Sequence, residues 1–253
     1  MFRVGDYVTR KKYNHDILFQ IKEINNNKIV LKGVDIRLYA DALEDDLIKR
    51  TIKRKNNDIE YIEIEKKENS FLIPGHILHI DSDKDYLNKC LDYYKNNHIK
   101  CYGFVFKEQE YSIKIIDLLE KFNPNIVVIT GHDAYYKLKD KYKNSKYYID
   151  CVKKIRKSYS KFENLIIIAG ACQSDFEGLI KAGATYASSP NHINISALDP
   201  AIIASYIALT EKTNIVNLEG ILNKTSCGPE GIGGIKTYGV MLYGFPRKDK
   251  NWI

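Results

Sequence analysis

Short hydrophobic blocks alternate with amphipathic segments from residue 75 to about residue 220. Short apolar runs are typical of buried strands, whereas apolar residues at every third or fourth position indicate helices. This alternation predicts an α/β domain with a parallel sheet between two layers of helices, because right-handed crossovers place helices over both faces. The expected strands are 76–80, 100–106, 125–130, 165–169 and 185–187, and the expected helices are 84–96, 111–122, 147–160, 175–182 and 200–209.

Residues 1–50 have a different pattern, in which short β-type stretches are separated by turn-like residues. Gly33 and the run Asn25–Asn27 are the clearest of these turns. Several short strands with little helix between them predict a small SH3-like β-barrel. The expected strands are 7–9, 17–24, 28–31 and 36–39.

Two further segments flank the predicted α/β domain at 75–220. Residues 51–74 are dense in charge and end at Pro74 and Gly75, which is typical of a linker. Residues 221–253 predict a turn-rich β appendage of the α/β domain, because they contain closely spaced glycines, namely Gly228, Gly231, Gly233 and Gly234.

The composition is that of an ordinary globular protein. Hydrophobic residues make up 44% and charged residues 28% of the 253 positions, which excludes long disorder and collagen-like architectures. The longest apolar run, 165–172, is far shorter than the about 18 residues of a membrane span. The first residues also lack the basic, apolar and small-residue zones of a secretory signal, so we expect a cytosolic protein that does not enter membranes. Five scattered cysteines without a C-x-x-C pair predict free thiols and no metal site, and no cofactor is expected.

The positive charge is concentrated in one segment. The net charge is +7, and Lys137–Lys161 alone carries ten basic residues against Asp140 and Asp150. Tyrosines interleave with these bases, as in some surfaces that bind single-stranded nucleic acid. The helical spacing of apolar residues such as Val152 and Ile155 instead favours the solvated face of an amphipathic helix. A non-catalytic module that binds RNA or protein through 137–161 stays open as the alternative function.

A histidine and a cysteine follow two successive predicted strands. The first strand runs into Gly131-His132-Asp133, and the second runs into Gly170-Ala171-Cys172. Reactive groups of open parallel sheets gather at the carboxyl ends of the strands, and neighbouring strands lie only about 4.8 Å apart. His132 and Cys172 are therefore predicted to face each other as a catalytic dyad.

The chemistry of acyl transfer needs these two residue types. A cysteine acts as a nucleophile through its thiolate, which a neighbouring imidazole and a helix N-terminus both favour. The backbone N–H groups of Cys172 and Asp133 are the candidate donors to the oxyanion. Taken singly, a cysteine at a strand end is more often a small buried hydrophobe, and a lone histidine is more often a surface group. Among the other cysteines, Cys90, Cys101 and Cys151 are expected to be structural and Cys227 stays undecided.

The order of these motifs resembles that of caspase-like cysteine peptidases, in which a hydrophobic block ending in Gly-His precedes one ending in Ala-Cys. More closely, the chain resembles the YabG family of sporulation-specific cysteine peptidases of spore-forming Firmicutes. The resemblance lies in Val4-Gly5-Asp6-Tyr7-Val8, Asp16–Phe19, Arg37–Asp41, Pro74–Asp83, Thr130–Tyr135 and Gly170–Ser174. Caspase-like enzymes usually carry glycine after the histidine, where this chain has Asp133, whose carboxylate is also a candidate to orient His132.

The resemblance implies a caspase-like, flavodoxin-like three-layer fold and a peptidase without a cofactor. It also implies limited processing of spore coat and germination-related precursor proteins, with cleavage after arginine. The expected place of action is the mother-cell cytoplasm and the surface of the spore, and the expected partners are protein substrates rather than nucleic acid.

Selectivity for arginine requires a carboxylate at the floor of the P1 pocket, because a buried guanidinium needs a bidentate partner. In the caspase-like arrangement a pocket residue comes from the end of the first strand, where this chain has Asp81 and Asp83. Ser188 and Ser189 end the stretch Gly178–Ser189, which resembles the helix and strand that line the substrate cleft of these peptidases, and they complete the predicted pocket. Two alternatives remain: Asp81 or Asp83 caps the next helix, or Asp81 is the phosphorylated residue of a receiver domain.

Overall fold

The computed structural model describes residues 1–25, 28–51, 61–64 and 70–245. Its main sheet has six strands in the order β14-β13-β12-β9-β7-β8. All neighbours are parallel except β14, which pairs antiparallel with β13. The strands are β7 (Ile77–Asp81), β8 (Cys101–Val105), β9 (Ile126–Ile129), β12 (Ile166–Ala169), β13 (Tyr186–Ser188) and β14 (Ile232–Gly234). The predicted, mainly parallel α/β sheet is confirmed.

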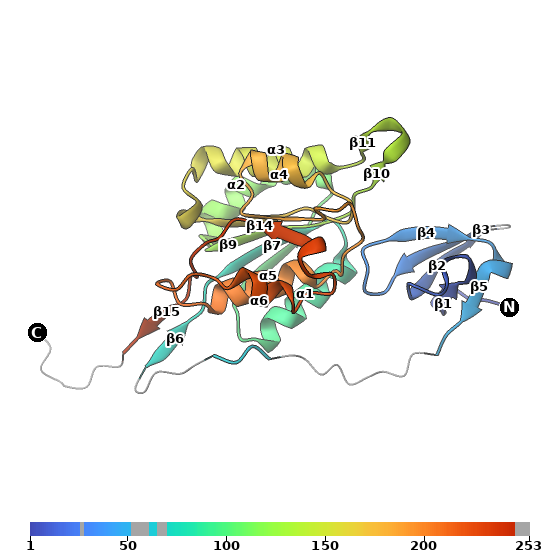
Figure 1. The fold of residues 1–253 in the computed structure, drawn as a ribbon, viewed down its shortest axis with the longest axis horizontal. Coiled ribbons are helices and arrows are strands. Elements are labelled where there is room, and N and C mark those ends of the chain that lie inside the picture. The colour runs from blue at the N-terminus through green and yellow to red at the C-terminus, as the bar shows by residue number, and fades with distance from the viewer. Residues whose placement is uncertain (26–27, 52–60, 65–69, 246–253) are drawn as a thin grey trace, which may run out of the picture.

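Helices cover both faces of this sheet and make three layers (Figure 1). Side chains alternate between the faces along each strand, so Ile168 packs in one core and Ile167 in the other. One core includes α1 (Lys84–Asn96), α5 (Asp199–Leu209) and α6 (Leu218–Leu222), and the other includes α2 (Tyr111–Phe122), α3 (Ser145–Ser158) and α4 (Phe176–Ala182).

The N-terminal residues form a separate five-stranded antiparallel sheet in the order β4-β3-β2-β1-β5. Its strands are β1 (Tyr7–Arg10), β2 (Phe19–Asn25), β3 (Lys28–Gly33), β4 (Tyr39–Ala42) and β5 (Leu47–Lys49). In the described part of the chain no ladder joins β4 to β5, so the sheet is open and the SH3-like barrel is not confirmed.

The predicted strand 36–39 is wrong in its position. Strand β4 begins at Tyr39. The loop Gly33–Leu38 starts at the last residue of β3 and is closed by a hydrogen bond of 2.7 Å from Gly33 N to Leu38 O. The apolar residues of this stretch look like a strand, but Ile36 pairs with Ser196 in the main domain instead.

The flanking segments are only partly described. In the predicted linker, residues 52–60 and 65–69 lie outside the described residues, and β6 (Phe71–Ile73) pairs with β15 (Leu242–Gly244) near the C-terminus. The predicted appendage supplies edge strand β14 to the main sheet, and its residues 246–253 lie outside the description. Asn26 and Asn27 of the predicted turn also lie outside it.

The basic segment contains an amphipathic helix, as predicted. In α3 the side chains of Val152 and Ile155 are buried, whereas Lys153 and Lys157 are exposed. Arg156 is an exception, because it is half-buried and donates hydrogen bonds to backbone oxygens outside the helix. An unpredicted hairpin, β10 (Tyr135–Tyr136) and β11 (Lys141–Tyr142), precedes α3 (Figure 1). Short 3₁₀ turns lie at Lys11–Tyr13, Glu44–Asp46, Glu108–Glu110, Lys137–Lys139, Phe162–Asn164 and Gly228–Glu230.

No helix among the described residues has both the length and the apolar character that crossing a bilayer requires.

The central strand β12 generates a prediction about stability. Ile167 is fully buried beneath the α2–α3–α4 layer, so Ile167→Ala is expected to lower the free energy of unfolding by about 2–5 kcal/mol. Ile113→Ala on α2 is the control, because Ile113 is 65% exposed and its truncation should change stability by less than about 0.5 kcal/mol. Urea unfolding measures both variants, and equal losses would contradict the assignment of β12 to the core.

Candidate active site

The carboxyl ends of β7, β9 and β12 lie side by side at one edge of the main sheet. Strand β7 ends at Asp81, β9 leads into Thr130-Gly131-His132, and β12 leads into Gly170-Ala171-Cys172. The topology therefore brings the predicted acid, histidine and cysteine segments to the same edge.

His132 is held in place mainly through its backbone. Its N–H donates to Glu108 Oε1 at 3.0 Å, and its carbonyl accepts from Asn144 Nδ2 at 2.8 Å and from the Tyr148 hydroxyl at 3.2 Å. A Cβ on Gly131 would lie 2.6 Å from the Tyr148 hydroxyl, so this turn needs glycine before the histidine.

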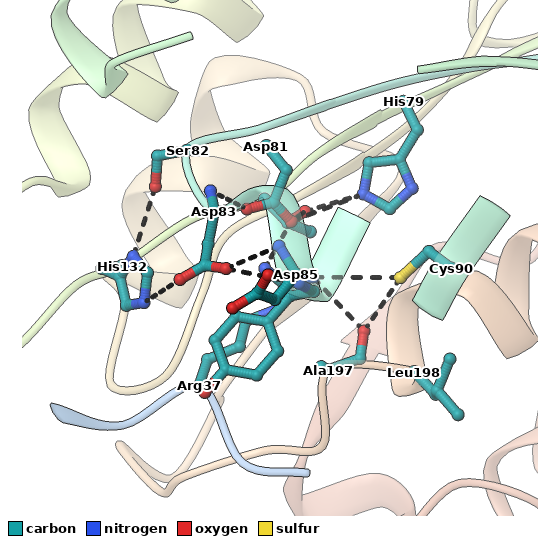
Figure 2. A network of polar contacts seen from close by, with 12 residues as sticks. Arg37, His79, Asp81, Ser82, Asp83, Asp85, Cys90, His132, Ala197 and Leu198 are labelled. Carbon is teal, nitrogen blue, oxygen red and sulfur yellow. Dashed lines mark hydrogen bonds and ion pairs between the residues drawn. The ribbon is translucent and has the colours of Figure 1, made fainter. Parts of the chain in front are cut away.

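The imidazole of His132 faces the loop after β7. Its Nδ1 lies 3.3 Å from Ser82 Oγ, and its Nε2 lies 3.7 Å from Asp83 Oδ2 (Figure 2). Since Ser82 donates its own proton to Glu108 at 2.6 Å, it accepts from Nδ1–H, which leaves Nε2 as the basic nitrogen of a neutral ring. Burial lowers the pKa of His132 and outweighs the opposing effect of Asp83.

Cys172 is buried, with 2% of its surface exposed. Its Sγ accepts from Ile195 N at 3.3 Å and lies 3.6 Å from Ile195 O. Burial raises the pKa of the thiol to about 11, against the smaller lowering effects of the Ile195 N–H and of Arg37. With this pKa the thiol is protonated at neutral pH. Across residues 1–25, 28–51, 61–64 and 70–245, no hydrogen bond or ion pair joins Cys172 to His132, so the thiol is not paired with the imidazole in this conformation.

The carboxylate of Asp133 ties the histidine loop to the cysteine loop. It accepts from Asn144 N at 2.7 Å, from Ser174 Oγ at 3.2 Å and from Ser145 Oγ. These partners occupy the carboxylate, which therefore fixes the two loops rather than the ring of His132. None of the hydrogen bonds in the described part of the chain uses the backbone N–H of Asp133 or Cys172, the two candidate oxyanion donors.

The predicted pocket residues separate into two groups. Asp83 is the N-cap of α1, where it accepts from Asp85 N at 2.9 Å and Tyr86 N at 3.3 Å, and it also pairs with Lys32 at 2.7 Å. The capping alternative is thus observed for Asp83, whereas Asp81 is the fully buried last residue of β7.

The two serines lie on the cysteine side of the site. Ser188 ends β13, and its buried hydroxyl has no hydrogen-bond partner in the described residues. Ser189 accepts from Gln173 N at 3.0 Å and donates to Ile193 O at 2.8 Å, so it supports the cysteine loop. No hydrogen bond among the described residues joins either serine to Asp81.

Asp81 forms a fully buried ion pair with Arg37, a residue of the N-terminal loop that sequence reasoning did not select as part of the site (Figure 2). Asp81 also accepts from Thr130 Oγ1 at 2.6 Å and from Asp83 N at 2.8 Å, while Arg37 donates to Ala197 O at 3.3 Å. Burial alone would raise the pKa of Asp81, but the Arg37 charge and these hydrogen bonds bring the pKa below its usual value.

His79 belongs to the same buried network as Asp81 and Thr130. Because Thr130 donates to Asp81, it accepts from His79 Nε2 at 2.7 Å, and His79 Nδ1 then accepts from the Tyr94 hydroxyl at 3.0 Å. Burial lowers the pKa of His79 to about 3, so the ring is neutral.

Comparisons with known proteins decide the family. The sequence model described as YabG peptidase U57 matches residues 3–64 and 51–246. The chain is also 37% identical over 286 aligned positions to the sporulation-specific protease YabG of Bacillus subtilis strain 168, covering 98% of this chain and 99% of that protein. The chain belongs to the YabG peptidase family. Membership in YabG favours a sporulation-specific peptidase over the non-catalytic binding module and over a phosphorylated receiver.

The Asp81–Arg37 pair generates a prediction about stability and pH. Asp81→Asn leaves the buried guanidinium without its counter-charge, so it should lower the free energy of unfolding by about 3–5 kcal/mol at pH 7. The pKa of Asp81 is lower in the folded state than in the unfolded state, so this contribution is complete above the ordinary aspartate pKa of 3.8 and is lost as pH falls through the folded value.

Urea unfolding of wild type and Asp81→Asn between pH 7 and pH 2 measures this difference. Asp41→Asn is the control, because Asp41 is 58% exposed in its pair with Lys28 and should contribute less than about 1 kcal/mol. A gap between wild type and Asp81→Asn that stayed constant down to the lowest pH would contradict an ionised Asp81.

Proposed function

We propose that this chain is a cysteine endopeptidase that cleaves spore coat and germination-related precursor proteins after arginine, with Cys172 as nucleophile and His132 as general base and acid. Membership in a peptidase family supports the reaction class. The observation that carries the assignment is the meeting of three segments at one sheet edge: the His132 loop, the Cys172 loop, and a buried carboxylate, Asp81, that already holds a guanidinium.

In the proposed reaction the neutral imidazole of His132 takes the thiol proton of Cys172, and the sulfur attacks the carbonyl carbon after the P1 arginine. The imidazolium then protonates the leaving amine, and water attacks the thioester with His132 again as base. The backbone N–H groups of Cys172 and Asp133 are the proposed oxyanion donors, each contributing about 3 kcal/mol in comparable sites. No cofactor takes part.

The conformation seen in the structure is not the reacting one, because Cys172 is buried and its thiol is protonated. The reaction needs the sulfur to be uncovered and to approach His132 Nε2. Asp133 joins the two loops through Ser145 and Ser174, which keeps their backbones in register while the side chains move.

Asp81 is the proposed floor of the P1 pocket. Asp83 is committed to Lys32 and to the start of α1, which supports Asp81 as the acid that selects arginine. Ser188 and Ser189 are assigned to the wall on the cysteine side. The proposed setting is the mother cell and the surface of the forming spore, with protein substrates as partners.

The dyad is tested by substitution. Cys172→Ala and His132→Ala should each lower kcat/KM for an arginine-containing precursor by about 10³-fold or more, because each removes a group that reacts with the substrate. Cys227→Ala and His98→Asn are matched controls: Cys227 is half-buried near the C-terminal turn, and His98 is exposed with a φ of 57° that asparagine tolerates. Full activity in either dyad variant would refute the proposed dyad.

The pocket is tested by the ratio of kcat/KM for arginine and norleucine at P1. Asp81→Asn should lower this ratio by about 30-fold or more, because the substrate guanidinium loses a desolvated partner. Asp83→Asn is the comparison and should leave the ratio unchanged, because a loss of folded enzyme lowers both kcat/KM values by the same factor. An unchanged ratio in Asp81→Asn would remove Asp81 from the pocket.

A further inference from the structure

The loop Gly33–Leu38 leaves the N-terminal sheet and inserts into the main domain. It joins β3 to β4, and Figure 1 shows the N-terminal sheet beside the main domain on the side of the β10–β11 hairpin. The loop ends in a tight turn, in which Leu38 N donates to Ile36 O at 2.8 Å. Arg37 lies at this turn and is fully buried.

The backbone of the loop pairs with the segment Ile195–Ala197 of the main domain. Ala197 N donates to Asp35 O at 2.8 Å, and Ile36 forms an antiparallel bridge with Ser196. This is the way in which an extended peptide adds to an exposed backbone edge. The same edge reaches the nucleophile, because Ile195 is the residue whose N–H donates to Cys172 Sγ.

The side chain of Arg37 occupies the proposed P1 pocket. Its guanidinium pairs with Asp81, and the positive charge of Arg37 lowers the pKa of the Cys172 thiol against the larger raising effect of burial. The ring of the nearby Tyr39 lies 5.2 Å from the ring of His132. The segment Arg37–Tyr39 therefore occupies the proposed pocket and lies beside the proposed base, while the loop backbone pairs with the residues next to Ile195, which contacts the nucleophile.

Two side chains of α1, Tyr86 and Lys89, form hydrogen bonds with the loop. The Tyr86 hydroxyl donates to Gly33 O at 2.6 Å and lies 2.8 Å from Ile36 O. Lys89 donates to Val34 O and pairs with Asp35 at 3.0 Å, and this lysine lies at the surface, with 37% of its side chain exposed.

We propose that Gly33–Leu38 is an internal occupant of the substrate cleft, bound as an arginyl peptide binds, and that protein substrates enter only when this loop leaves. The inference rests on the proposed function and adds to it the binding mode: substrate backbone along Ile195–Ala197 and arginine on Asp81. The Asp81 carboxylate already accepts hydrogen bonds from Thr130 and from Asp83 N, so Arg37 and a substrate arginine compete for its remaining hydrogen-bonding capacity.

The first experiment measures displacement without catalysis. A fluorescent peptide ending in arginine is titrated into full-length Cys172→Ala and into Cys172→Ala/Lys89→Met, and hydrogen exchange of the amides of 33–38 is followed. The Lys89→Met change should tighten binding about fivefold, since it removes the hydrogen bond of Lys89 to Val34 O and its exposed ion pair with Asp35. Bound arginyl peptide should also speed exchange in 33–38, whereas the norleucine peptide should not.

Lys49→Met is the matched control in the same background, because Lys49 is 58% exposed and pairs with Asp6 far from the loop contacts. Equal affinities in the Lys89 and control proteins, unchanged exchange at saturating peptide, or no binding to any of them would overturn the proposal.

The second experiment measures activity with Cys172 present. Lys89→Met should hydrolyse an arginyl peptide about fivefold faster than wild type, and Arg37→Gln more than tenfold faster, whereas Lys49→Met and Arg3→Gln should match wild type. If Arg37→Gln fails to fold, the Lys89 variant still decides the question.

The internal occupant and the peptidase activity can fail separately. If wild type and all loop variants hydrolyse the peptide at the same rate, and this activity depends on Cys172, the hypothesis of an internal occupant is refuted and the proposed function stands. If the arginyl peptide displaces the loop but no variant hydrolyses it, the peptidase assignment is refuted and the hypothesis of an internal occupant stands.

Discussion

The buried ion pair between Arg37 and Asp81 sets the geometry of the whole site. Removing both charges from water is costly, and hydrogen bonds to the two groups offset part of that cost. Thr130 and the backbone N–H of Asp83 donate to the carboxylate, and His79 in turn orients Thr130. The guanidinium donates to Ala197 O, and its Nε has no hydrogen-bond partner among the described residues. The pair thereby fixes the end of β7.

The loop after β7 depends on this fixed point. Asp83 starts α1 and lies 3.7 Å from the imidazole of His132, and Ser82 contacts the other ring nitrogen. Arg37 also joins the N-terminal sheet to the edge where the histidine and cysteine loops meet. One interaction therefore links the N-terminal sheet, the proposed pocket and the proposed base, and in the proposed reaction the arginine of the substrate takes the place of Arg37 on Asp81.

Much of the main domain could be predicted because its signals are local. The apolar strands and the 3.6-residue periodicity of α1 and α2 identified those elements to within a residue or two, and the carboxyl-end rule placed His132 and Cys172 at one edge. The capping role of Asp83 was also visible, since an aspartate directly before an amphipathic helix is a common N-cap. The loop Gly33–Leu38 was misread because Ile36 and Leu38 are β-type residues whose partners lie elsewhere.

Arg37 could not be assigned from the sequence, because its contacts are with Asp81 and Ala197, which lie 44 and 160 positions away. The edge strand β14 was hidden for a similar reason, since a three-residue strand with two glycines has no alternation to detect. The serines of the predicted pocket came from family resemblance alone. Ser189 contacts the cysteine loop rather than Asp81, and the Ser188 hydroxyl has no hydrogen-bond partner among the described residues. Long-range pairing is the information that local patterns lack.

The most direct test of the proposed site is the structure of the full-length chain after reaction with a peptidyl-arginine electrophile that alkylates Cys172. We expect a thioether at Cys172, the ligand guanidinium on Asp81 in place of Arg37, and Gly33–Leu38 displaced from Ile195–Ala197. An adduct at Cys172 with Arg37 still paired to Asp81, or alkylation of another residue in place of Cys172, would contradict it.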